Sequence, residues 1–272
     1  MIISDTSALV LNWTSKDVWQ SKNARDYFNN LDLSAADILY KKFDRHLDFV
    51  QSQSLTNRKF FIRKCAVEFL EQCKTENKTG QVIILAAGID PLSVEIASLY
   101  PHSKVFDVDK YAMKEKEKCL NGACPNIKFL ECDITNIELL KKCLAGSRYN
   151  FNQPGIMVLE GITYYLIEND LRNVLAFFAA NNLKMVCDFG IRPECVDEDK
   201  RALGIEIVSK IKETVNLEFM NCYEPNYFMK LVEQSGFKNA QRFTMANIQQ
   251  QRTGEITPFD GNESAWVALV KN

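Results

Sequence analysis

The sequence predicts an α/β protein with a mostly parallel central sheet, because short apolar runs alternate with helical segments from residue 81 onward. The expected strands are Val82–Leu85, Lys104–Val108, Ile127–Glu131, Gly155–Leu159 and Leu183–Phe189. The expected helices between them are Pro91–Tyr100, Ala112–Leu120, Ile137–Leu144 and Glu168–Ala180. Right-handed crossovers of this length cover both faces of a parallel sheet and place all the strand C-termini along one edge.

The pattern changes after the fifth strand. Two helical stretches are expected over Glu194–Asn216 and Glu224–Ser235, and two β-runs follow over Lys238–Met245 and Ser264–Lys271. A polar stretch, residues 246–263, separates the β-runs and is expected to be a loop. A pair of strands after the last helix predicts a C-terminal antiparallel hairpin at one edge of the sheet.

The N-terminal part carries no strand signal. Two segments, Ser34–Gln51 and Thr56–Cys73, have the apolar spacing of amphipathic helices. A polar turn over residues 75–80 precedes the first strand. We therefore expect a helical lid or cap over residues 1–79 and an α/β core over residues 80–272.

Composition restricts the function further. The 272 residues fit one large domain or a domain with an appended lid. The formal net charge is −2, from 33 basic and 35 acidic side chains, which argues against nucleic acid as the partner. No apolar run is long enough for a membrane span. Residues 1–10 lack the basic region of a secretory signal. We therefore expect a cytoplasmic protein that does not have a membrane as its partner.

Cysteine and histidine usage agrees with this expectation. Nine cysteines are scattered without a C-x-x-C pair, which suggests buried thiols in a reducing compartment. The two histidines, His46 and His102, have no close cysteine or histidine neighbours, so no metal site is expected. His102 is interpreted as a turn residue and His46 as a helix residue that could reach a cleft from the lid. The charged run over residues 114–118 is interpreted as a solvated helix face.

The most informative motif joins the first two expected strands. The first strand runs into a small-residue turn, Ala86–Asp90, and the second ends in Asp109, 21 positions beyond Gly88. An acidic residue at about this spacing reaches the ribose hydroxyls of a bound nucleotide, while the turn allows close approach of backbone N–H groups. The motif favours an adenosine-bearing ligand. An ordinary βα turn is the structural alternative. Because a full G-x-G-x-x-G is absent, a nicotinamide-dependent oxidoreductase is disfavoured.

Carboxylates also stand at the ends of two other expected strands. Asp133 follows the third strand and Glu160 follows the fourth. Parallel strands end at the same edge, so Asp109, Asp133 and Glu160 are expected to converge there. Open α/β sheets bind their ligands at that edge.

Four blocks resemble the leucine carboxyl methyltransferase family of class I S-adenosylmethionine-dependent methyltransferases. The blocks are Asn57–Phe61, Leu85–Asp90, Val105–Asp109 and Leu159–Leu166, within a similarity that extends from about residue 50 to the end. The resemblance implies a Rossmann-like sheet and S-adenosylmethionine as the cofactor.

The resemblance also implies roles at the methionine end of the cofactor. Arg58 would pair with the methionyl carboxylate, for which a planar guanidinium is well suited. Ala86 and Gly88 would lie under the methionine end, although Ala86 stands where the family has glycine. Glu160 would contact the methionyl ammonium or line the methyl-transfer pocket.

At the adenosine end, Asp109 would accept both ribose hydroxyls. Asp133 would accept the adenine amino group, and the Ile134 N–H would bind a ring nitrogen. Tyr164 and Tyr165 follow the glutamate block. One is expected in the core and the other facing the methyl acceptor, which makes both candidates for the catalytic site together with Glu160.

The expected function is that of an O-methyltransferase acting on a carboxylate of a small molecule or peptide. A carboxylate is already ionised, so its methylation requires no general base. A hydroxyl acceptor would require one, and His46 or Tyr164 could serve. A non-catalytic S-adenosylmethionine-binding regulatory homologue is the alternative that Ala86 favours.

Overall fold

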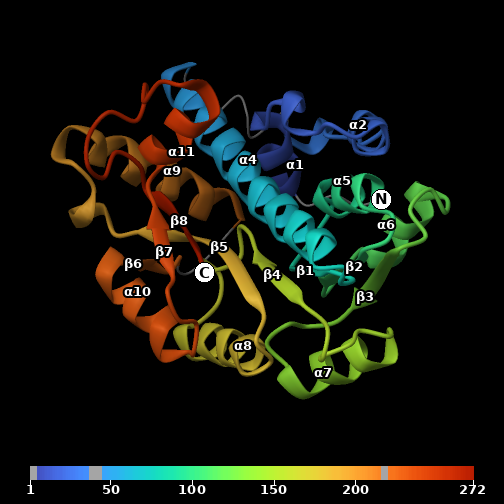
Figure 1. Ribbon diagram of the computed structural model, residues 1–272. Coiled ribbons are helices and arrows are strands. Elements are labelled where there is room, and N and C mark those ends of the chain that lie inside the picture. The colour runs from blue at the N-terminus through green and yellow to red at the C-terminus, as the bar shows by residue number, and fades with distance from the viewer. Residues whose placement is uncertain (1–4, 37–44, 216–219) are drawn as a thin grey trace.

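The computed structural model describes residues 5–36, 45–215 and 220–272, and an eight-stranded sheet runs through its centre (Figure 1). The strands are β1 Gln81–Leu85, β2 Lys104–Asp109, β3 Ile127–Glu131, β4 Gly155–Leu159, β5 Lys184–Ile191, β6 Cys222–Tyr223, β7 Gln241–Phe243 and β8 Val267–Lys271. Their order is β3-β2-β1-β4-β5-β8-β7, and β6 pairs with β5. Among the described strands, β8 pairs antiparallel with β5 and with β7, and the other pairings are parallel. This confirms the predicted mostly parallel sheet with a C-terminal antiparallel pair.

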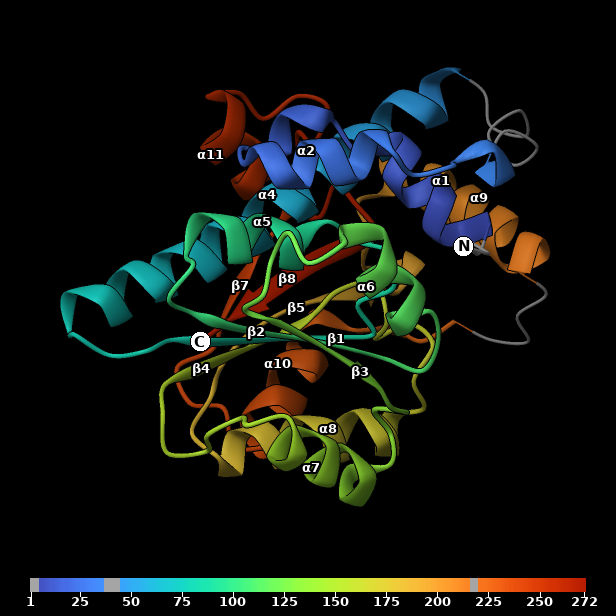
Figure 2. The ribbon, with the colours of Figure 1, turned by 90° about the vertical axis from the view of Figure 1, so that its right-hand side faces the viewer.

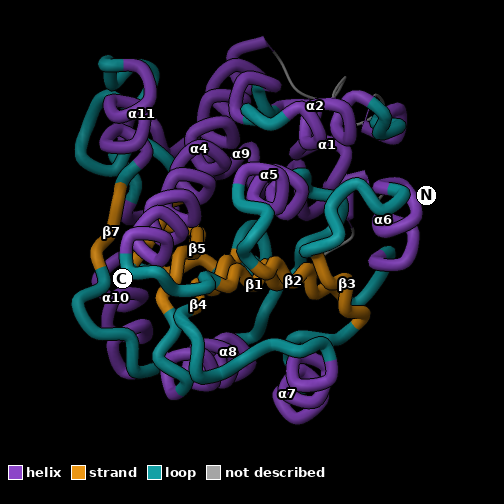
Figure 3. The backbone as a smooth tube through the Cα atoms, turned by 45° about the vertical axis from the view of Figure 1, so that its right-hand side comes forward, coloured by secondary structure: helices purple, strands orange, loops and turns teal. Residues whose placement is uncertain are grey.

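Helices cover both faces of the sheet and form a three-layer arrangement (Figure 2). They are α1 Asp5–Trp13, α2 Lys22–Asn29, α4 Arg45–Thr75, α5 Leu92–Leu99, α6 Met113–Leu120, α7 Ile137–Gly146, α8 Glu168–Ala180, α9 Glu198–Val215, α10 Pro225–Gln234 and α11 Met245–Thr253. Short 3-10 turns are η1 Lys16–Val18, η2 Ser34–Ala36 and η3 Pro193–Cys195. Helices α7, α8 and α10 lie below the sheet in Figure 3, and the others lie above it.

The alternation of side chains along β1 explains why the sheet has two apolar faces. Val82 and Ile84 belong to the core under α4 and α5, whereas Ile83 and Leu85 belong to the core under α7 and α8. Every residue of β1 is buried. Full burial of one such side chain contributes about 1.5–3 kcal/mol, so a continuous apolar run is the stable choice for a central strand.

Helix α4 differs from the expected pair of helices. The structure has one 31-residue helix, so the expected break between residues 51 and 56 is wrong. The expected helix over Ser34–Gln51 is also wrong at its start, where η2 stands, while residues 37–44 lie outside the described residues. No helix among the described residues has the length and apolar character needed to cross a bilayer.

The N-terminal helices α1 and α2 carry no strong sequence signal, yet both pack against helices that cover the sheet, α1 against α4 and α2 against α5. Leu11 and Trp13 of α1 and Phe28 of α2 belong to the same hydrophobic core as β1 and α4. The Tyr27 hydroxyl of α2 donates to the Ile89 carbonyl in the turn after β1, at 3.1 Å. The boundary between a cap and a core near residue 79 stays a prediction.

The expected polar loop over residues 246–263 is wrong in its first half, where α11 forms. Thr244 begins the helix with a capping box, because its hydroxyl accepts from the Asn247 N–H and the Asn247 side chain accepts from the Thr244 N–H. Gly254 ends it with a left-handed φ of 84°. These local caps, rather than an apolar stripe, mark the helix.

Candidate functional site

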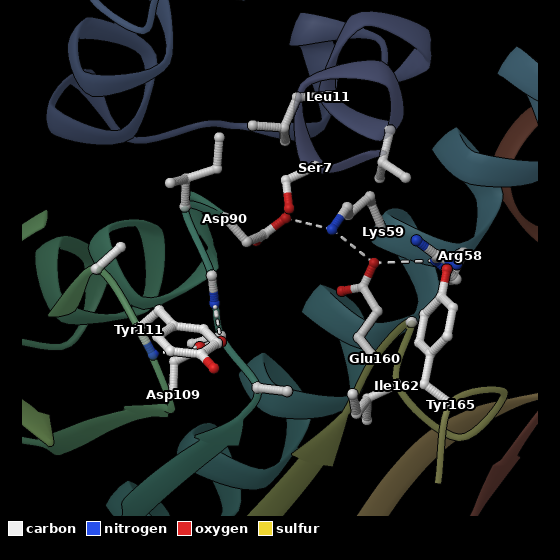
Figure 4. Close-up of a pocket in the computed structure, with 17 residues that line it drawn as sticks. Ser7, Leu11, Arg58, Lys59, Asp90, Asp109, Tyr111, Glu160, Ile162 and Tyr165 are labelled. Atoms are coloured by element: carbon white, nitrogen blue, oxygen red, sulfur yellow. Dashed lines mark hydrogen bonds and ion pairs between the residues drawn. The ribbon is translucent and has the colours of Figure 1, made fainter. Parts of the chain in front are cut away.

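A cavity of about 350 Å³ opens where β1, β2 and β4 end (Figure 4). Its walls come from α1, α4, the turn after β1, the end of β2 and the turn after β4. The lining residues are Ser7, Val10, Leu11, Arg58, Lys59, Ala86, Ala87, Gly88, Ile89, Asp90, Asp109, Tyr111, Ala112, Glu160, Gly161, Ile162 and Tyr165. This is the sheet edge at which open α/β proteins bind ligands.

The turn after β1 is fixed against Asp109. Asp109 Oδ2 accepts from the Gly88 N–H at 2.9 Å, and Oδ1 accepts from the Tyr111 N–H at 3.0 Å. Ala86 and Gly88 both have a left-handed backbone, with φ of 52° and 49°. Glycine adopts this conformation freely, whereas an alanine pays about 1–2 kcal/mol. Each Asp109 oxygen retains a lone pair that a ligand hydroxyl can use.

Arg58 and Lys59, adjacent on α4, form the cationic part of the cavity. Arg58 donates from Nε to Glu160 and from Nη1 to Asp188, both at 3.0 Å. Lys59 pairs with the Asp90 carboxylate and with Glu160, the latter at 2.6 Å. These five side chains, which we call the edge cluster, comprise two cations and three carboxylates, so their formal charge is −1.

Burial and charge act in opposite directions on the pKa values of the edge cluster. Burial alone would lower the pKa of Arg58 and Lys59, but their carboxylate partners raise both above the usual values. Burial raises the pKa of Glu160, although Lys59 and Arg58 oppose that rise. Both cations therefore remain charged at neutral pH.

Asp188 on β5 is a member of the edge cluster that sequence reasoning missed. It is fully buried, and besides Arg58 it accepts from the Gly161 N–H at 2.7 Å and from the Tyr164 hydroxyl. A carboxylate inside an apolar strand is costly to bury without partners. The position of Asp188 in the apolar run Leu183–Phe189 was therefore the sequence signal for a buried, paired carboxylate. Lys59 and Asp90 were also missed, although both lie in the motifs already described.

The two tyrosines after Glu160 differ in position. Tyr165 lines the cavity, whereas Tyr164 is buried behind it, with its hydroxyl on Asp188 and its ring 5.4 Å from that of Trp266. Burial raises the pKa of Tyr164 well above its usual value, and Asp188 adds to this. A phenol so placed does not accept a proton from a ligand in the cavity.

Asp133 and Ile134 lie farther along the edge and do not line the cavity. Asp133 accepts from the Thr135 N–H and hydroxyl, and pairs with Lys110 at 3.0 Å. The Thr135 hydrogen bonds lower the pKa of Asp133. Tyr111, which sequence reasoning did not single out, lines the cavity with an exposed ring.

The histidines contribute nothing to the described site. His102 is exposed and precedes β2, so it lies at the opposite edge of the sheet from the cavity. The His46 side chain lies outside what the structure describes. The structure thus brings together Arg58, Ala86, Gly88, Asp109, Glu160 and Tyr165 from the predicted site residues.

The strand order, the antiparallel end of the sheet and the cavity beyond β1, β2 and β4 define a class I methyltransferase architecture. A family model, Leucine carboxyl methyltransferase, matches residues 3–179, which is more than half of the chain. The chain belongs to the leucine carboxyl methyltransferase family and is an S-adenosylmethionine-dependent methyltransferase. No curated protein matches the sequence significantly.

A solved bacterial structure shares the fold at low sequence identity, and two others show weaker similarity. A Thermobifida fusca protein assigned as a methyltransferase is 15% identical, with a TM-score of 0.61 over 97% of this chain and 93% of its own. A Burkholderia thailandensis protein of an O-methyltransferase family is 11% identical, with a TM-score of 0.48 over 82% of this chain and 59% of its own. Human N-acetylserotonin methyltransferase, solved with S-adenosylmethionine, is 12% identical, with a TM-score of 0.43 over 92% of this chain and 69% of its own.

Proposed function

We propose that this methyltransferase is an O-methyltransferase that methylates a carboxylate of a small molecule or peptide. The observation that carries the proposal is that the charged side chains lining the cavity are already engaged as ion-pair or hydrogen-bond partners. Glu160 and Asp90 accept from cations, and Asp109 accepts from two backbone N–H groups. Burial raises the pKa of Tyr165. An acceptor that arrives ionised suits such a cavity, because no proton must be removed.

The charges of the edge cluster fit the cofactor. S-adenosylmethionine carries a sulfonium, an ammonium and a carboxylate, which sum to +1, and the cluster carries −1. When bound, the cofactor supplies an electrophilic methyl group. We assign its amino-acid carboxylate to Arg58 and Lys59, and its ammonium to Glu160 and Asp90. The carboxylate and the ammonium of the ligand would then each meet an opposite charge that is already buried and oriented, which reduces the cost of desolvation.

The ribose hydroxyls are assigned to Asp109, whose carboxylate is held in place by the turn. Ala86 and Gly88 line the floor between the two ends. The adenine is assigned to Asp133 and Ile134 on the basis of the family resemblance. Their position supports this, because the neighbouring Cys132 N–H donates to the Asp109 carbonyl at 2.8 Å and so places both residues beside Asp109.

The remaining task of the protein is to orient the acceptor and exclude water. Val10, Leu11 and Ile162 offer apolar surface in the cavity, and Tyr165 adds an aromatic wall. Holding two reactants in line can lower the activation barrier by about 7–11 kcal/mol, so no further chemical group is required.

We place the enzyme in the reducing cytoplasm, which is supported by its nine free thiols.

The test is transfer of a labelled methyl group from S-adenosylmethionine to matched acceptors. Small carboxylic acids and peptides with free C-termini are compared with their amidated or alcohol counterparts. A methyl ester releases volatile labelled methanol in mild alkali, whereas a methyl ether does not. We expect alkali-labile label on the free carboxylates only. Alkali-stable label on an alcohol would contradict the carboxylate assignment.

A second measurement addresses the cofactor without any acceptor. We expect calorimetry to detect binding of S-adenosylmethionine and of its demethylated product, S-adenosylhomocysteine, but not of NAD. The reason is the Asp109 spacing together with the incomplete glycine motif. Binding of NAD alone would overturn the assignment of the cavity.

A further inference from the structure

One lysine of the charged run 114–118 is not solvated, contrary to the sequence-based expectation. Lys114, Glu115, Glu117 and Lys118 are exposed, but the Lys116 side chain is 0% exposed. Its ammonium lies 2.7 Å from the carboxylate of Asp107, also 0% exposed, in the middle of β2. Lysine is almost never fully buried unless it is paired, so this side chain needs a specific explanation.

The Lys116 ammonium has a second partner in the turn after β1. It donates to the Asp90 carbonyl at 2.7 Å. The carboxylate of the same Asp90 pairs with Lys59 in the edge cluster and accepts from the Leu92 N–H at 2.8 Å. The preceding carbonyl, that of Ile89, accepts from the Tyr27 hydroxyl. Lys116 thus restrains the backbone of the residue whose side chain faces the cavity.

Ion pairing alone does not account for this arrangement. Asp107 Oδ2 accepts from Lys116 and from the Ser93 hydroxyl at 2.6 Å, while Oδ1 has no hydrogen-bond partner among the described residues. Burial raises the pKa of Asp107 despite these contacts. Replacing a buried ion pair by apolar side chains is often neutral or stabilising. The contribution that an apolar pair could not supply is the hydrogen bond that Lys116 donates to the Asp90 carbonyl.

We propose that Lys116 is a positioning residue for cofactor binding, because it fixes the turn 87–90 through the Asp90 carbonyl. The same ammonium connects α6, whose preceding residues Tyr111 and Ala112 line the cavity, to the turn after β1, which forms another part of the lining. Two walls of the cavity are therefore held in register by one buried cation. This inference rests on the proposed placement of the cofactor in the cavity.

The decisive variant separates positioning from stability. Lys116→Met alone leaves a buried unpaired carboxylate and is expected to destabilise the fold. The double variant Lys116→Met/Asp107→Leu removes the charge from both partners and also removes the bond to Asp90. Asp107→Asn keeps Lys116 and that bond. Lys118→Met, on the exposed face of the same helix, is the matched control.

Binding of S-adenosylhomocysteine is measured by calorimetry, with urea unfolding and amide hydrogen exchange on the ligand-free protein. For the double variant we expect affinity about tenfold weaker, the equivalent of one lost charge-assisted hydrogen bond. We also expect faster exchange at the Gly88–Asp90 amides and stability close to that of the parent. Asp107→Asn and Lys118→Met should bind within about twofold of the parent.

Two outcomes would overturn the proposal. The first is a double variant that folds and binds S-adenosylhomocysteine like the parent. The second is an Asp107→Asn variant whose affinity falls as much as that expected for the double variant. Cofactor binding would then depend on the ion pair and not on the hydrogen bond to the Asp90 carbonyl. If the parent and Lys118→Met themselves fail to bind, the proposed cofactor site is wrong, which is a distinguishable result.

Discussion

The two ends of the cavity are built in different ways. At one end Arg58 reaches Glu160 and Asp188, which lie 102 and 130 positions away in the sequence, and all three side chains are at most 8% exposed. At the other end Asp109 accepts from Tyr111 two positions on, and beyond the cavity along the same edge Asp133 accepts from Thr135 two positions on. The first end depends on tertiary structure and the second largely on local turns.

This difference has an energetic consequence. Charges buried in the edge cluster cannot turn to water when a partner is removed, so the remaining charge is left uncompensated. The groups at the Asp109 end are more exposed, and water can satisfy them. Substitutions in the edge cluster should therefore lower both stability and cofactor affinity, whereas those at the Asp109 end should lower affinity alone.

The largest effect is expected for Asp188→Ala. It leaves Arg58 Nη1 and the Tyr164 hydroxyl without their buried acceptor, although Arg58 Nε keeps Glu160. The free energy of unfolding should therefore fall by about 3–5 kcal/mol. Urea denaturation measures this, and Asp199→Asn, at an exposed aspartate, is the control. A loss below about 1 kcal/mol, typical of a surface pair, would show that the edge cluster is not a buried ionic unit.

Asp109→Ala is expected to affect binding without affecting the fold. Two hydrogen bonds to a charged acceptor, each worth about 1.5–3 kcal/mol, would be lost, so affinity for S-adenosylhomocysteine should fall by at least about a hundredfold. The unfolding free energy should change little, because water replaces the carboxylate at the Gly88 and Tyr111 N–H groups. An affinity change under about threefold would exclude Asp109 as the ribose ligand.

For Arg58→Ala we expect a loss of cofactor affinity of at least about tenfold, together with a measurable loss of stability. Arg58→Lys should restore binding only in part, because an ammonium cannot replace the fork that joins Glu160 to Asp188. Hydrogen exchange over residues 45–70 should slow when cofactor is added, since Arg58 would connect α4 to the ligand. If Arg58→Ala binds the cofactor normally and added cofactor does not change the hydrogen exchange, Arg58 neither binds the cofactor nor connects α4 to it.

Glu160 should make cofactor binding sensitive to pH. Burial raises its pKa, and the groups facing it are Lys59, Arg58, Asp90 and Asp188. The ionised form is needed to hold an ammonium, so affinity should fall as pH falls through that raised pKa. The decline should therefore begin above the range near 4.3 of an exposed glutamate. Glu160→Gln should bind more weakly at neutral pH and lose this dependence, and an unchanged pH profile in that variant would reject the assignment.

Sequence reasoning succeeded where the determining contacts are local. The alternation of β1, the turn 86–90 and the 21-residue spacing to Asp109 all reflect short-range geometry. The parallel direction of β1 to β5, with their C-termini at one edge, followed from general crossover rules. The family resemblance supplied Arg58 and Glu160 as cofactor residues, but it could not give their partners. Asp188 meets Arg58 only because β5 and α4 pack on one another.

Most of the errors come from contacts that are distant in the sequence, whereas one comes from a polar helix with a local cap. Lys116 was interpreted as solvated because its neighbours at 114, 115, 117 and 118 are charged, yet the position faces Asp107 across the packed layer. Helix α11 was missed because its capping box is its main signal, whereas its composition is polar. The pairing of Tyr164 with Asp188, rather than with an acceptor, likewise depends on a contact 24 positions away.

The smallest predicted effect concerns the backbone beneath the cavity. Ala86 has a φ of 52°, so Ala86→Gly should remove left-handed strain and raise stability by up to about 1 kcal/mol. Loss of a methyl group from the cavity floor should also strengthen S-adenosylhomocysteine binding, by about two- to fivefold. Ala87→Gly is the matched control: Ala87 is buried and has no positive φ, so glycine there should destabilise by about 0.5–1 kcal/mol. Effects of opposite sign on stability at these adjacent positions, with binding measured in parallel by calorimetry, would show that Ala86 destabilises the turn. If Ala86→Gly binds more weakly instead, the methyl group contacts the cofactor, and the turn has adapted to alanine.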